Sequence, residues 1–93
     1  MTDVTQSETP TWRADVDALW FRPSHHGGVC MVHRRAFGTL LKHAAAPEDC
    51  VAFFRQHAAA FQAAARAKIV RTGLGQGANL HLTSRDVRRQ IGI

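Results

Sequence analysis

The chain has 93 residues and a mass of 10.3 kDa, which is enough for one small domain and too little for a multidomain enzyme. Hydrophobic residues make up 45% of the chain and charged residues 20%, as is typical of a folded, soluble protein rather than a disordered one. The net charge of +5 at pH 7 is compatible with a polyanionic partner.

The positive charge is unevenly distributed. Residues 1–17 contain four acidic residues and one basic residue, Arg13, whereas residues 18–93 contain eleven Lys or Arg and three acidic residues. Residues 1–11 are polar and aperiodic, which predicts a flexible tail followed by a single domain over 12–93. No apolar stretch approaches the ~18 residues of a membrane span, and the start resembles no secretory signal. We therefore expect a cytoplasmic protein with no membrane partner.

Two strands joined by a turn are expected first. Residues 15–22 are rich in β-branched and aromatic side chains and end at a turn over 23–28, which contains a proline and paired glycines. Residues 29–33 form the returning strand. A third strand over 79–82 alternates, with both of its leucines on one face.

Helical spacing lies between these strands. Apolar residues over 36–41 predict a short helix, and Pro47 begins a longer one that runs to about residue 71, where Gly73 supplies a left-handed cap. Lys68 falls on the apolar stripe near the end of this helix, and we expect its ammonium to reach water. Thr83 and Asp86 form a capping pair for a short closing helix.

The sequence thus predicts an α+β fold with the order strand, strand, helix, helix, strand, short helix. The sheet is expected to be three-stranded and antiparallel, with the helices on one face. The side chains toward the helices are Leu19, Phe21, Cys30, Val32, Leu80 and Leu82. Those on the opposite face are Val16, Ala18, Trp20, Val29, Met31, His33 and His81.

The histidines and cysteines invite a metal interpretation, which their spacing disfavours. His25, His26, Cys30 and His33 lie close in sequence, but Cys30 and His33 point to opposite faces of one strand. We expect no metal site and no cofactor, folding without zinc, and zinc affinity no tighter than micromolar. Cys30 and Cys50 are assigned to the core and not to catalysis.

Glycines and arginines are the remaining candidates for ligand binding. Gly73, Gly75 and Gly77 follow a helix and precede a strand, the reverse of a phosphate-binding loop, so a flexible connection is expected. Arg85, Arg88 and Arg89 could together neutralise nucleic-acid phosphates, although Arg88 and Arg89, being adjacent, point in different directions. A solvated basic surface is the alternative explanation.

Several segments together resemble a known family. They are the hairpin around Gly28, Val29 and Cys30, the pair Ala36 and Phe37, the helix segment from Phe53 to His57, and Leu80 to Thr83. Over about residues 16–86 the chain resembles a family of small bacterial proteins, the domain-of-unknown-function family numbered fourteen eighty-eight. The resemblance implies this fold and a bacterial cytoplasmic setting, and it implies no catalytic residues. The paired histidines and the arginine-rich end depart from the family pattern.

The absence of a converging acid, base and nucleophile predicts a non-enzymatic interaction or regulatory module. Trp20 and Met31 would form an apolar patch on the open sheet face, which indicates an association site. We expect a homodimer with these two residues at the centre of the interface and His33 and His81 near its rim. In the alternative, the N-terminal tail or the last helix covers the sheet and the protein is a monomer. A nucleic-acid-binding accessory protein is the second functional alternative.

Overall fold

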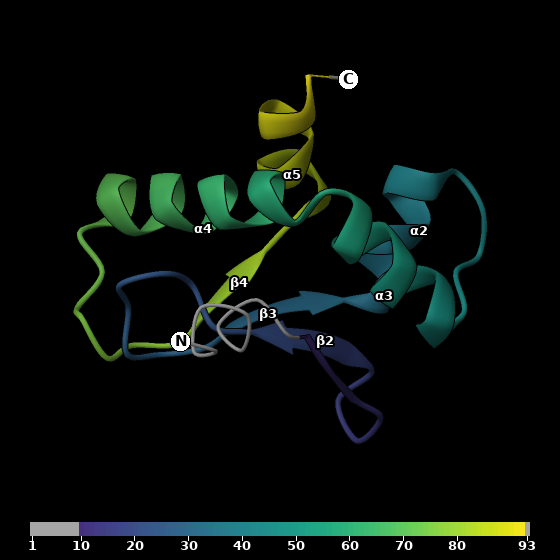
Figure 1. Ribbon diagram of the computed structural model, residues 1–93, viewed down its shortest axis with the longest axis horizontal. Helices are drawn as coiled ribbons and strands as arrows, with labels where there is room; N and C mark the ends of the chain where they lie inside the picture. Colours follow the sequence, from purple (N-terminus) through teal and green to yellow (C-terminus); the bar gives the residue numbers. More distant parts are fainter. Residues whose placement is uncertain (1–9, 93) are drawn as a thin grey trace, which may run out of the picture.

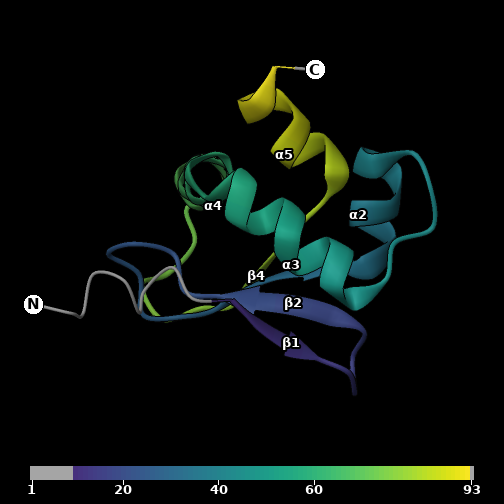
Figure 2. The ribbon, with the colours of Figure 1, turned by 45° about the vertical axis from the view of Figure 1, so that its right-hand side comes forward.

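The computed structural model describes residues 10–92, which form a four-stranded sheet with four helices on one side of it (Figures 1 and 2). The strands are β1 (Thr11–Arg13), β2 (Ala18–Phe21), β3 (Cys30–His33) and β4 (Leu80–Leu82). The helices are α2 (Arg34–Leu41), α3 (Pro47–Gln56), α4 (Ala58–Thr72) and α5 (Ser84–Ile91). The predicted α+β class is confirmed. Most of the predicted tail lies outside the described residues, and its last residue, Thr11, begins β1.

The predicted three-stranded antiparallel sheet is wrong in two respects. The sheet has four strands in the order β1-β2-β3-β4, and β4 pairs with β3 in parallel, while the other two pairs are antiparallel. The parallel pair arises because the chain leaves β3 directly into α2 and returns after α4, as a crossover connection requires. β1 has three residues, too few for an alternation to be visible in the sequence.

The predicted long helix over 47–71 is two helices. The backbone of His57 departs from helical geometry between α3 and α4, with φ −123° and ψ 31°. Across this bend, Phe53 and Phe54 of α3 both contact Phe61 of α4, with ring centroids 6.1 and 5.0 Å apart. The left-handed cap at Gly73 is confirmed, with φ 65°.

The core lies between the sheet and the helices, as predicted. All six side chains assigned to the inner face are at most 5% exposed, and both cysteines are buried. Phe37, Phe54 and Phe61 are fully buried against them. The alternation of the strands was therefore sufficient to identify the inner face of the sheet.

Two loops at one end of the sheet lie against each other. The Gly27 N–H donates to the Gln76 carbonyl at 2.8 Å, and the His26 ring nitrogen Nε2 lies 2.7 Å from the Ala78 carbonyl. A Cβ on Gly28 would lie 2.2 Å from that same Ala78 oxygen. Glycine is therefore required at position 28 by the close approach of two backbones.

Candidate interaction surface

The outer face of the sheet carries one side chain from each strand in a continuous row. The strand register places Thr11 opposite Trp20, Trp20 opposite Met31, and Met31 opposite His81. Residues paired across neighbouring strands share a face. None of the helices within residues 10–92 lies on this side of the sheet (Figures 1 and 2). We call these four residues, with Arg13 and His33, the outer surface.

Trp20 is less open than the sequence indicates, because a neighbouring strand covers its ring. The Arg13 guanidinium lies 4.3 Å from the centre of the Trp20 ring, a cation–π contact. Asp15 holds that guanidinium, with an Nη2–Oδ2 distance of 2.9 Å. Trp20 and Met31 are both half-buried, and Ala18, predicted on the same face, is fully buried. The outer surface is therefore not a purely apolar patch, because it combines the Met31 thioether with imidazole and guanidinium groups.

The indole N–H of Trp20 is an unpaired donor. Its Nε1 atom is shielded from water and has no hydrogen-bond acceptor in the described part of the chain. A buried donor without an acceptor costs free energy, so it is uncommon unless another interaction compensates.

The two histidines of the outer surface form a stacked pair. The rings of His33 and His81 have centroids 5.5 Å apart and planes inclined by 4°, and both residues are exposed. The sequence correctly predicted that each histidine lies on the outer face, but it did not predict that the two rings are neighbours. Their adjacency depends on the parallel register of β3 and β4, which no local pattern reveals.

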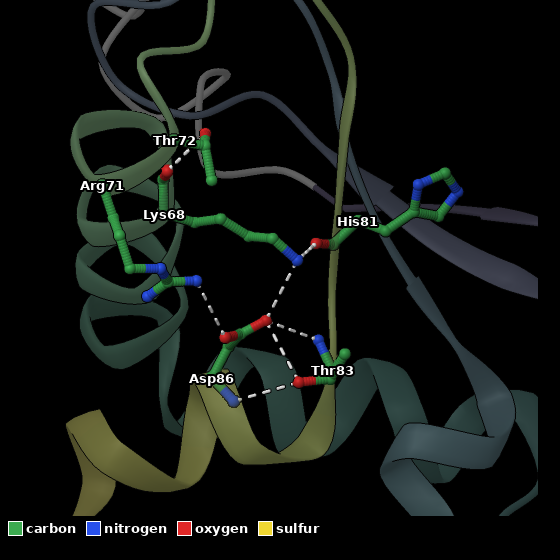
Figure 3. A network of polar contacts seen from close by, with 6 residues as sticks. All are labelled: Lys68, Arg71, Thr72, His81, Thr83 and Asp86. Atoms are coloured by element: carbon green, nitrogen blue, oxygen red, sulfur yellow. Dashed lines mark hydrogen bonds and ion pairs between the residues drawn. The ribbon is translucent and has the colours of Figure 1, made fainter.

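A polar network on the other side of β4 holds this strand in place (Figure 3). The Lys68 ammonium donates to the His81 carbonyl at 2.6 Å and lies 3.3 Å from Asp86 Oδ2. Arg71 approaches the other carboxylate oxygen at 3.7 Å. The imidazole of His81 points away from the network, as Figure 3 shows. The Lys68 side chain is 24% exposed, and its ammonium, which was expected to reach water, also has two acceptors, the His81 carbonyl and the Asp86 carboxylate.

The capping pair of α5 is part of the same network. The Thr83 hydroxyl accepts from the Asp86 N–H at 3.2 Å, and the Asp86 carboxylate accepts from the Thr83 N–H at 2.9 Å, which confirms the predicted cap. Burial raises the pKa of the Asp86 carboxyl, but the Thr83 N–H and the Lys68 ammonium more than offset it and hold the pKa below its ordinary value. Asp86 is therefore a structural anion at neutral pH.

A hollow of about 500 Å³ lies beside His33, between the first turns of α2 and α5. Arg35, Thr39, Thr83 and Ser84 contribute to its lining. Asp17 and Arg34 also line it and neutralise each other, with 2.9 Å between Oδ1 and Nε. The hollow therefore has a polar lining in which Arg35 supplies the unbalanced charge.

The cysteines are placed as predicted. Burial raises the pKa of the Cys50 thiol to about 11, with a further contribution from the Asp49 charge, and it raises that of Cys30 further still. Both therefore remain protonated thiols at neutral pH, in which state they are poor nucleophiles.

The loop histidines and Cys30 do not converge on a metal site. Across residues 10–92 no group of three or more His, Cys, Asp or Glu is arranged to hold a metal ion. His26 is buried in contact with the Ala78 carbonyl, while His25 is exposed and has a left-handed backbone with φ 58°. Their roles in the described structure are thus those of loop residues.

The candidate phosphate ligands lie on α5. Arg85, Arg88 and Arg89 are all exposed, and within the described residues no ion pair involves them. Their spacing of i, i+3 and i+4 places all three on one side of the helix. Arg88 and Arg89 point in different directions, as expected, but viewed down the helix axis Arg85 projects between the two. α5 therefore presents a basic surface.

Comparisons with family models, with curated proteins and with solved structures found no match. The resemblance to the small bacterial family stays a prediction. None of the helices formed by residues 10–92 has the length and apolar character needed to cross a bilayer.

Proposed function

We propose that the chain is a non-enzymatic cytoplasmic interaction module that associates with a second copy through the outer surface. The observation that carries the proposal is the one-sided arrangement of the fold. All the helices described within 10–92 pack on the inner face, so the row from Thr11 to His81 has no cover from them (Figure 2). A face of this kind can pair with its own copy about a two-fold axis.

Two further features support the outer surface as the contact. Met31 occupies the middle of the row, with Trp20 on one side and His81 on the other. The Trp20 indole N–H, which has no acceptor within the described residues, is a donor that a partner's acceptor could satisfy. Aromatic, Met and Arg side chains are also the types enriched at interfaces.

Light scattering on the full chain at tens of micromolar tests the proposal. We expect a dimer for the wild type and a monomer for Met31→Glu, because a carboxylate at the centre of the interface would be desolvated without a partner, at a cost of several kcal/mol. Val70→Glu is the matched control, since Val70 is 73% exposed on α4, away from the outer surface. This control should remain a dimer.

A wild-type monomer, or a dimer that Met31→Glu leaves intact, would remove the outer surface as the interface. A variant lacking residues 1–9 distinguishes the tail alternative. If the wild type is monomeric and this deletion dimerises, the tail and not a second copy occupies the sheet face.

Nucleic-acid binding is the second candidate, favoured by the common side of α5 that Arg85, Arg88 and Arg89 share. We expect duplex affinity that is independent of sequence and falls steeply with salt. Replacing the three arginines together with alanine should reduce the slope of log K against log salt by up to about three units. Fluorescence anisotropy with a labelled duplex measures it, and the lack of any binding at low salt would exclude this candidate.

A further inference from the structure

We propose that His33 and His81 together chelate a divalent transition-metal ion, with Zn²⁺ as the reference ligand, on the outer face of the sheet. The two residues are 48 positions apart in the sequence and are brought together by the sheet. The two ring centroids lie 5.5 Å apart, and the rings come from adjacent strands. Imidazole nitrogen is a preferred ligand of zinc, copper and nickel.

The strand register brings both rings to one side. His81 lies opposite Met31, and His33 follows Met31 by two residues, so all three side chains project from the outer face. Bidentate binding needs two ring nitrogens that each reach about 2.1 Å from one ion. Stacked exposed rings can converge on an ion by rotation about the terminal side-chain torsion, whose energy wells are broad.

The backbone beneath the pair is fixed before any ion binds. The Lys68 ammonium holds the His81 carbonyl, and β4 is anchored at its end by the capping pair of α5 (Figure 3). His33 closes β3 and precedes the first residue of α2. Because the backbone under both rings is already fixed, binding one ion together restricts only the side-chain torsions, which favours chelation over two separate weak contacts.

The surroundings set the class of ion. Two imidazoles without a carboxylate suit borderline metals and do not suit Mg²⁺ or Ca²⁺, which require oxygen ligands. Asp17, the acid in the adjacent hollow, is bonded to Arg34, and Arg35 adds a positive charge there. The remaining coordination positions are left to water or to an external ligand. Such a site is exchangeable and is not required for folding, although it departs from the sequence-based expectation of no metal site.

The site is complete within one chain, so it does not depend on the proposed self-association. Calorimetric titration of the full chain with ZnCl₂ at neutral pH is expected to show one ion bound per chain with an affinity in the micromolar range. NMR of the imidazoles should show shifts at His33 and His81 together. Light scattering in the same buffer records the oligomeric state separately, so a failure of one proposal is distinguishable from a failure of the other.

Variants locate the site. His33→Gln and His81→Gln should each weaken zinc binding by at least about tenfold, because each removes one of two ligands. His43→Gln is the matched control, an exposed histidine in the loop after α2 whose ring contacts the Ala44 carbonyl, and it should bind zinc like the wild type. Circular dichroism confirms that each variant is folded. Zinc binding that is unchanged in both test variants, or equally reduced in the control, would overturn the proposal.

Discussion

Gly28→Ala is expected to lower the free energy of unfolding by about 2–3 kcal/mol, because its Cβ would overlap a backbone carbonyl oxygen of the facing loop. A Cβ atom at position 28 would lie 2.2 Å from the Ala78 carbonyl oxygen and 2.6 Å from the Ala78 carbonyl carbon. Both loops would have to separate, which would also strain the contact between His26 and the same carbonyl. Urea denaturation followed by circular dichroism measures the change.

Gly75→Ala and Gly77→Ala are the matched controls in the facing loop. Neither glycine has an atom within 4 Å of its built Cβ, and neither has a positive φ. Alanine there should be neutral or stabilise by a few tenths of a kcal/mol, since it restricts the unfolded chain. Equal destabilisation at all three positions would mean that loop flexibility, and not the contact between backbones, determines the effect.

Asp86→Ala is expected to lower the free energy of unfolding at pH 7 by about 2–3 kcal/mol. The substitution removes the cap of α5 and leaves the Lys68 ammonium, whose side chain is 24% exposed, without its carboxylate. Asp49→Ala is the control, because Asp49 accepts from the Ala46 N–H at 3.0 Å and caps α3 without an ion pair in the described residues. That variant should lose about 1 kcal/mol.

The Asp86 contribution has a defined pH dependence. The folded pKa lies below the ordinary value of 3.8, so the stabilisation is fully present above that value and is lost as the pH falls through the folded pKa. The difference between wild type and Asp86→Ala should therefore be constant near neutral pH and shrink below about pH 4. A difference that instead grows on acidification would contradict the assigned role of the carboxylate.

Local patterns were sufficient for the parts of the fold that depend on nearest neighbours. The alternation of Leu80 and Leu82 gave the inner face, and the offset of Thr83 and Asp86 gave the cap of α5. The left-handed cap at Gly73, at the end of α4, could also be predicted, because it depends only on the backbone conformation of the glycine itself.

Features that depend on distant segments could not be predicted in this way. The direction of β4 relative to β3 is set by the path of the intervening helices, and the break at His57 lies between phenylalanines that pack on each other from its two sides. The adjacency of His33 and His81 follows from that direction together with the register, in which His81 lies opposite Met31. The two acceptors of Lys68 could not be predicted for the same reason, since they lie on β4 and α5.

The parallel pairing of β3 with β4 also sets an order of events during folding. Cys30 pairs with Leu80 across 50 residues, whereas β2 and β3 are joined by a short loop. The loop-closure entropy is smaller for the hairpin, so β1, β2 and β3 are able to assemble first, with β3 at the edge of the sheet. Until β4 arrives, the open hydrogen-bonding edge of β3 is a template for other chains. Hydrogen exchange should show the β4 amides, and those β3 amides that pair with β4, gaining protection last, and concentrated refolding should lose the most protein to aggregation in this interval.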